Sequence, residues 1–317
     1  MGLGHLIRCG ALAMKLRARG AREILFALPP GAPERRMVSG RGLRVRTLRH
    51  NGLLPKSYAY VVDLEAPQER WPFSFASRPV ALAVIDDAGL VRDGVDLIVN
   101  PNANADPSWY GQGAPLCMGP EYALLRREFE TARRRPRKVS NRGRQAVVSL
   151  GGSDPGRGTE RIMKALSGVD IDIDVIVGPG FLRKVEPARN TVARFRIWRN
   201  PARMASRFLS TDLAIVGGGS TLYEIAACGT PAIALSFNRT QHAHAGRLAE
   251  RGVIAYLGPI SELNPERLRS MSRVLLSNHA LRRSMSRAGR ALVDGRGTDR
   301  VATSLFEVIA HPPQNTP

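Results

Sequence analysis

Three glycine-containing loops hold the residues whose types and spacing could carry chemistry. The first is Gly2-Leu3-Gly4-His5, which opens a predicted amphipathic helix over residues 6–19. The positive end of a helix dipole disfavours imidazolium, so a neutral His5 could act as a general base toward water. A lone histidine near a terminus is also compatible with a solvated surface position, and the residue types alone leave both interpretations open.

The second loop, residues 217–221, reads GGGST and follows the apolar run 212–216. Glycines let backbone N–H groups approach a phosphate, and the helix that begins there adds roughly half a positive charge. Glu224 lies one turn into that helix, where its carboxylate can accept from two ribose hydroxyls or merely cap the helix. The loop is neither a Walker loop nor a GxGxxG motif. We predict a nucleotide diphosphate site here, formed by Gly218, Gly219, Ser220, Thr221 and Glu224.

The third loop, GGSDP at residues 151–155, also follows an apolar strand pattern. Gly151, Gly152 and Ser153 are predicted to contact the same substrate, although a plain strand-to-helix connection uses similar residues. His242 and His244 share one predicted helix, but a spacing of two residues does not bring two side chains together. We therefore predict no metal site and no cofactor.

Apolar runs alternate with helix-like segments in both halves of the chain, which predicts an α/β fold with parallel sheets. We expect two Rossmann-like domains facing each other across a cleft, because ligands bind beyond the carboxyl ends of such strands. The predicted divisions are an N-terminal domain over 1–132, an exposed basic linker over 133–144, a nucleotide-binding domain over 145–310 and a tail over 311–317.

The amino-acid composition limits the classes of partner that can be expected. The 317 residues carry a formal charge of +20, which either indicates anionic partners or reflects arginine in place of lysine on solvated faces. Aromatic residues make up 6% and do not alternate with basic ones, so a nucleic-acid partner is not predicted. The three cysteines are scattered, and no membrane-spanning run or secretory signal is visible. We expect a cytoplasmic monomer, with transient contact to a membrane surface left open.

In order along residues 1–257, several motifs resemble the UDP-sugar hydrolase family of the pseudaminic-acid pathway. They are GLGHLIRCGALA (2–13), VIDD (84–87), DLIVNPN (96–102), Tyr110, GPEYALLRREF (119–129), GGSDP and GGGSTLYEIAACGTP (217–231). The family has the GT-B architecture and is related to the N-acetylglucosaminyltransferase that forms lipid II. Its members hydrolyse a UDP-linked diacetamido-trideoxy sugar to UDP and free sugar.

The resemblance implies that His5 is the base, with Gly4, Arg8 and Gln241 at the substrate. It also implies a β-strand ahead of Gly2, so we expect the first strand of the N-terminal domain to be missing from this chain. On the sugar side the chain departs from the family pattern at two places. Leu64-Glu65 stands where the family has a tyrosine two residues past the aspartate, and Thr240-Gln241 stands where the family has an Asn-Gln pair. The alternatives are a GT-B glycosyltransferase that uses a UDP-sugar, or a non-catalytic protein that binds one.

Overall fold

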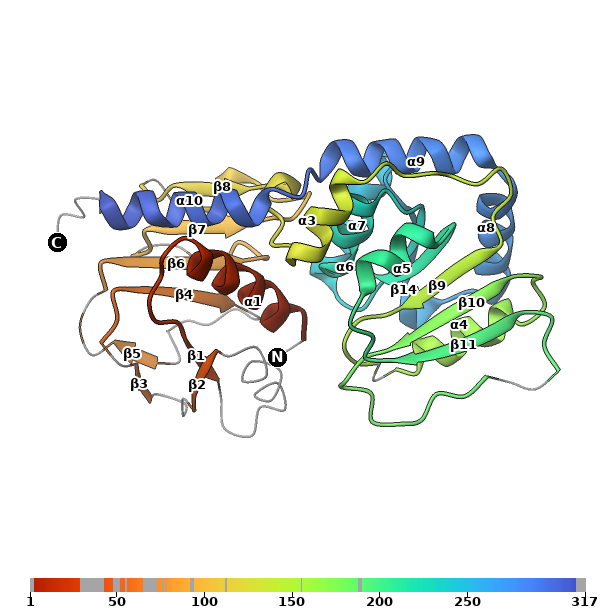
Figure 1. The fold of residues 1–317 in the computed structure, drawn as a ribbon, viewed down its shortest axis with the longest axis horizontal. Helices are drawn as coiled ribbons and strands as arrows, with labels where there is room; N and C mark the ends of the chain where they lie inside the picture. Colours follow the sequence, from red (N-terminus) through yellow and green to blue (C-terminus); the bar gives the residue numbers. More distant parts are fainter. Residues whose placement is uncertain are drawn as a thin grey trace. The chain divides into compact units, whose positions relative to one another are not determined.

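The computed structural model describes residues 3–28, 43–47, 52–54, 56–64, 73–75, 77, 79–91, 94–111, 113–154, 156–187 and 190–311. The chain divides into two units (Figure 1). The first comprises Met1, His5–Arg126 and Arg296–Pro317, and the second comprises Gly2–Gly4 and Arg127–Gly295. No described helix is both long and apolar enough to span a bilayer.

The first unit is built on a four-stranded parallel sheet in the order β4-β6-β7-β8. Two further parallel pairs, β1-β2 and β3-β5, stand as separate sheets. The bounds of its elements are α1 (Leu3–Ala18), β1 (Leu25–Leu28), β2 (Arg44–Thr47), β3 (Gly52–Leu54), β4 (Ala59–Leu64), β5 (Phe73–Phe75), β6 (Ala81–Asp86), β7 (Leu97–Asn100), η1 (Pro107–Trp109), β8 (Leu116–Met118), η2 (Pro120–Tyr122) and α10 (Gly297–Ala310).

Strand β6 shows why this sheet forms the core of the unit. All six of its residues are buried, and alternate side chains enter two different apolar clusters. Ala83 and Ile85 pack with Leu12 of α1 and Leu305 of α10, whereas Val84 packs toward Tyr110. A strand covered on both faces is expected to be a nearly continuous apolar run, and β6 has this composition.

The C-terminal helix α10 belongs to the first unit, not to the second as the predicted range 145–310 required. Its apolar stripe, which includes Val301, Leu305 and Val308, is buried against the first sheet, and Figure 1 shows α10 lying along β7. Thr298 also exchanges hydrogen bonds with the backbone of Leu125. The predicted C-terminal boundary is therefore wrong, because an amphipathic stripe does not specify which of two similar sheets covers it.

The second unit contains a six-stranded parallel sheet in the order β11-β10-β9-β12-β13-β14. The order reverses between β9 and β12, the topological switch point at which doubly wound sheets bind ligands. The bounds of its elements are α3 (Arg127–Arg134), β9 (Gln145–Ser149), α4 (Gly158–Leu166), β10 (Asp172–Val177), β11 (Arg194–Arg199), α5 (Met204–Ser210), β12 (Leu213–Gly217), α6 (Thr221–Cys228), β13 (Ala232–Ser236), α7 (Arg239–Glu250), β14 (Ala255–Pro259), η3 (Ile260–Glu262), α8 (Pro265–Ser277) and α9 (His279–Leu292).

The predicted basic linker lies within the second unit, at and beyond the end of α3. Phe129 of α3 is fully buried and stacks on Phe208 of α5, with ring centroids 6.1 Å apart. Beyond α3, Arg137 donates to backbone oxygens at the end of α5, among them Phe208 O at 2.9 Å. Residues 133–144 therefore do not link two domains, because they lie inside the unit formed by Arg127–Gly295. Most of them are exposed, as predicted, and the contacts of Arg137 fix the segment to the end of α5.

The α/β class with Rossmann-like units is confirmed. Residues 312–317 of the predicted tail, and Glu65 on the predicted sugar side, lie outside the described residues.

Candidate active site

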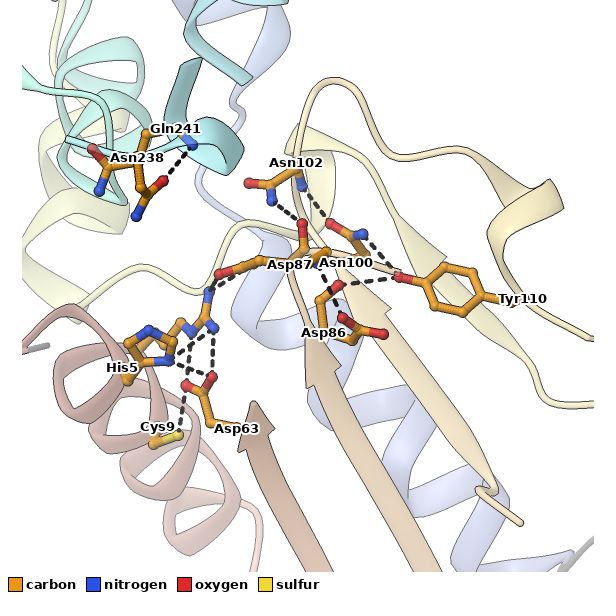
Figure 2. Close-up of polar contacts among 12 residues, drawn as sticks. His5, Cys9, Asp63, Asp86, Asp87, Asn100, Asn102, Tyr110, Asn238 and Gln241 are labelled. Atoms are coloured by element: carbon orange, nitrogen blue, oxygen red, sulfur yellow. Dashed lines mark hydrogen bonds and ion pairs between the residues drawn. The ribbon is translucent and has the colours of Figure 1, made fainter. Parts of the chain in front are cut away.

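His5 is paired with a carboxylate at the end of a neighbouring strand (Figure 2). Its Nδ1 lies 2.6 Å from Oδ1 of Asp63, which is near the carboxyl end of β4. The His5 side chain is 19% exposed and that of Asp63 only 7%, so the ring reaches solvent while its partner is enclosed. This is the arrangement in which an acidic residue orients a histidine that exchanges protons with a substrate.

The Asp63 carboxylate is kept ionised by its donors. Burial acts to raise the pKa of this carboxyl, but the charge and hydrogen bonds of Arg8, with the hydrogen bond of His5, hold it well below its ordinary value. An ionised carboxylate cannot donate, so the proton shared with His5 is carried by Nδ1. The neutral imidazole therefore has its lone pair on Nε2.

Arg8 joins Asp63 to a second carboxylate. Its Nε donates to Asp63 Oδ2 at 2.7 Å and its Nη2 to Asp63 Oδ1 at 2.5 Å. Its Nη1 lies 2.9 and 2.7 Å from the two carboxylate oxygens of Asp87. Arg8 is only 7% exposed, and although burial acts to lower its pKa, Asp87 and Asp63 raise that pKa well above the ordinary value. The guanidinium that the sequence predicted at the substrate is thus engaged by two carboxylates of its own unit.

The turn that carries Asp87 is fixed by hydrogen bonds (Figure 2). The buried carboxylate of Asp86 accepts from the backbone N–H groups of residues 88, 90 and 91. Tyr110 donates to Asp86 O at 3.1 Å and accepts from Asn100, while Asn102 Nδ2 donates to Asp87 O at 2.9 Å. Residues of the VIDD and DLIVNPN motifs therefore hold the backbone turn that positions Asp87.

In the second unit, the two glycine loops differ in whether their helices are already capped. The carboxylate of Asp154 accepts from Gly158 N and Thr159 N, both at 2.7 Å, so a side chain of the loop occupies the N-terminus of α4. At α6, Ser220 makes no side-chain capping bond. Among the described residues, no partner accepts from the backbone N–H groups of Gly219, Ser220 and Thr221. Three donors at a helix N-terminus form an anion site, so a phosphate is better accommodated by α6 than by α4.

The other predicted contacts of the second unit lie around α6. A Cβ placed on Gly218 would meet Gln241 Cβ at 3.1 Å, so Gln241 packs against the glycine loop. Gln241 Oε1 accepts from Phe237 N at 2.9 Å, which orients its amide. Glu224 is 8% exposed in the first turn of α6.

The Gly151–Ser153 loop follows β9, which pairs with β12 at the switch point. A cavity of about 280 Å³ lies beside it, lined by residues that include Ser153, Asp154, Arg157, Glu160 and Phe181. The structure thus divides the predicted residues into two groups. His5 and Arg8 belong to the first unit, whereas Gly4 and the residues from Gly151 to Gln241 belong to the second. The assignment of these residues to a substrate stays a prediction.

The histidines of α7 have separate roles. His242 Nδ1 lies 2.8 Å from the hydroxyl of Tyr256, and buried His244 packs against the ring of Tyr223. Within the described residues, no group of three or more His, Cys, Asp or Glu side chains is arranged to hold a metal ion.

Sequence reasoning missed Asp63 and Asp87 as partners of His5 and Arg8. The available signal was that each comes at the end of an apolar run, in YVVD and VIDD. Carboxyl ends of adjacent parallel strands meet at one edge of a sheet, which places such residues together.

Comparison with known proteins supports the fold. No family model matches the sequence. The spore coat polysaccharide biosynthesis protein SpsG of Bacillus subtilis is 33% identical over 207 residues, covering 60% of this chain and 58% of that protein. The uncharacterized protein MJ1062 of Methanocaldococcus jannaschii is 24% identical over 284 residues, covering 83% of this chain and 58% of that protein. The chain thus spans 58% of the length of each of these relatives.

Solved structures match over nearly the whole chain. MurG of Acinetobacter baumannii has a TM-score of 0.63 at 15% identity, covering 96% of each chain. The spinosyn rhamnosyltransferase SpnG complexed with thymidine diphosphate has a TM-score of 0.63 at 16% identity, covering 95% of this chain and 96% of that one. The chain therefore has the α/β fold with two Rossmann-like units that the GT-B glycosyltransferases share.

Proposed function

We propose that this protein displaces UDP from the anomeric carbon of a UDP-sugar, with His5 as general base, in the biosynthesis of a surface polysaccharide. The observation that carries the proposal is the pairing of His5 Nδ1 with Asp63 at 2.6 Å. That pairing directs the basic lone pair of the neutral ring to Nε2, on a side chain that remains 19% exposed.

The reaction balances with these groups. A nucleophile O–H attacks the anomeric carbon, its proton passes to His5 Nε2, and the bond from that carbon to the diphosphate oxygen breaks with inversion. The electron pair leaves on UDP, whose terminal phosphate has a second pKa of about 6, so no dedicated general acid is needed. Asp63 stabilises the imidazolium that forms.

The second unit would hold the leaving group. The open N–H groups of Gly219, Ser220 and Thr221 can donate to the diphosphate as its charge develops. Glu224 would accept from the ribose hydroxyls, and Gln241 would reach the sugar beside the loop. The relative SpsG, described as a spore coat polysaccharide biosynthesis protein, and SpnG, solved with thymidine diphosphate, support a nucleotide-sugar substrate in this role.

Two nucleophiles fit the same base. An acceptor hydroxyl would make the protein a glycosyltransferase, which the named activities of SpnG and the spinosyn forosaminyltransferase SpnP favour. Water would make it a hydrolase of a UDP-linked diacetamido-trideoxy sugar, which the ordered motifs from GLGH to GGGST favour. We place transfer first, because the structural comparisons with these neighbours extend over nearly the whole chain.

The test measures UDP release from a panel of UDP-sugars, with and without sugar acceptors, for the wild type and His5→Gln. Release that depends on an acceptor and is lost in His5→Gln supports transfer, and release without an acceptor supports hydrolysis. His5→Gln should still bind UDP in calorimetry, because His5 lies outside the α6 loop. Turnover that survives in His5→Gln would overturn the assignment of the base, and an absence of turnover with every pair would overturn the proposal. A parallel panel of TDP-sugars separates the choice of nucleotide from the choice of reaction.

A further inference from the structure

Within the described part of the chain, five side chains around His5 are joined by hydrogen bonds and ion pairs. We call them the His5 cluster: His5, Arg8, Cys9, Asp63 and Asp87. Every nitrogen of the Arg8 guanidinium contacts a carboxylate oxygen of the cluster. Cys9 Sγ donates to Asp63 Oδ2 at 3.3 Å, and burial followed by the Asp63 charge raises the pKa of this thiol well above its ordinary value. Cys9 therefore adds no charge to the cluster at neutral pH.

The charge of the cluster depends on the proton of His5. Two carboxylates and one guanidinium give a net charge of −1 while the imidazole is neutral. When His5 takes up a proton, the cluster becomes neutral. Charges held close together in a partly buried site interact more strongly than in water. The negative charge of Asp87 therefore helps to stabilise the imidazolium that His5 forms on proton transfer.

Asp87 does not contact His5, yet it is connected to it through Arg8. The Arg8 guanidinium spans the ends of β4 and β6, which pair in parallel with Asp63 opposite Ile85. The Asp87 backbone is held in turn by Asn102. The side chain of Asp87 is 25% exposed, against 9% for Arg8, so solvent screens its charge only in part.

We infer that Arg8 and Asp87 are positioning residues for the proposed base: Arg8 holds the Asp63 carboxylate against His5 Nδ1, and Asp87 supplies the negative charge that balances Arg8 when His5 is protonated. This inference rests on the proposed function, and it assigns to Arg8 a role other than contact with the substrate.

Opposite charge changes should move the pH profile in opposite directions. Asp87→Asn removes a negative charge and disfavours the imidazolium, so the acid limb of kcat/KM for UDP release should move to lower pH, by roughly half a unit. Arg8→Met removes a positive charge and should move that limb to higher pH. A merely structural role would lower kcat/KM at every pH without moving the limb. Asp106→Asn, which removes an exposed carboxylate that caps η1 in the same unit, is the matched control and should move nothing.

A second measurement keeps this inference separate from the proposed function. The imidazole signals of the six histidines can be titrated by NMR without any substrate, and His5→Gln identifies the signal of His5. The His5 midpoint should fall in Asp87→Asn and return toward the wild-type value in Asp87→Glu. Midpoints that coincide in wild type and Asp87→Asn would overturn the inference, even if UDP release follows the proposed reaction. If UDP release fails with every substrate while the midpoints still move, the proposed function fails and the electrostatic coupling stands. If Arg8→Met does not fold, the direction of the Asp87→Asn shift decides alone.

Discussion

The Thr298 hydroxyl both accepts a hydrogen bond from and donates one to the backbone of Leu125, a residue 173 positions earlier in the sequence. Leu125 N donates to Thr298 Oγ1 at 2.9 Å, and Thr298 Oγ1 donates to Leu125 O at 3.0 Å. Thr298 is 1% exposed, so both bonds are shielded from water. This side chain fastens the first turn of α10 to the segment at which the first unit ends.

Thr298→Val should lower the free energy of unfolding by about 1–3 kcal/mol, because it leaves a buried backbone N–H and C=O without partners. Urea denaturation followed by circular dichroism measures the change. The control is Thr303→Val, an exposed position on the same helix, which should change stability by less than about 0.5 kcal/mol. Equal losses in the two variants would contradict the assigned contact.

Gly219→Ala should weaken UDP binding while leaving the fold intact. A Cβ at this position would meet only Gln241 Nε2, at 3.7 Å, which is an ordinary contact. The methyl group would nevertheless lie beside the open N–H groups of the α6 loop and hinder a phosphate. We expect the dissociation constant for UDP to rise about tenfold in calorimetry, a loss of about 1.4 kcal/mol. Gly246→Ala in α7, where a Cβ meets nothing within 4 Å, is the control and should bind UDP as the wild type does.

Asp154→Ala should lower stability and leave UDP binding nearly unchanged, the reverse of the effect expected for Gly219→Ala. Removal of the carboxylate that caps α4 should cost about 1 kcal/mol of stability. UDP affinity should stay within about twofold of the wild type, because the open donors are on α6. A large loss of UDP affinity without a loss of stability would move the diphosphate site to the GGSDP loop.

Asp63→Asn tests the orientation of His5. An amide can present an N–H to His5 Nδ1, which would favour the tautomer with its proton on Nε2 and remove the basic lone pair. We expect kcat to fall by about 10²–10⁴ with little change in UDP affinity. Steady-state UDP release and calorimetry on the same preparation separate these effects. A variant with wild-type kcat would contradict the role given to the Asp63–His5 pair.

Stability should fall on acidification between about pH 6.5 and pH 4, in part because of His244. Burial lowers the pKa of His244 from 6.5 to about 4. Below pH 6.5 the unfolded chain binds a proton that the folded chain does not, so stability declines as pH falls through this window and levels off below pH 4. The full effect is about 3 kcal/mol. His244→Phe should flatten this part of the curve, whereas His242→Phe, at an exposed position, should leave it unchanged.

Sequence reasoning was reliable where one local pattern decides the structure. The apolar run at 212–216 became β12, all of whose residues are buried, because a strand covered on both faces is apolar nearly throughout. The glycine loops GGGST and GGSDP followed β12 and β9 as expected. The place of α10 was not accessible, because its apolar stripe fits either unit equally well. Asp63 and Asp87 were missed as partners of Arg8 because 55 and 79 residues separate them from it, and only the strand order brings them together.

Because α10 packs on the first unit but follows the second unit in sequence, the two units can complete their folding at different stages of synthesis. Residues 127–295 form the second unit almost without interruption, so this part can fold as soon as it leaves the ribosome. The first unit is translated earlier, but its core includes Val301, Leu305 and Val308. The part of its apolar face that α10 covers, beside Leu12 of α1, therefore stays exposed until residues 301–308 have been made. The half that carries the proposed base is thus the half most exposed to chaperones and proteases in the nascent protein.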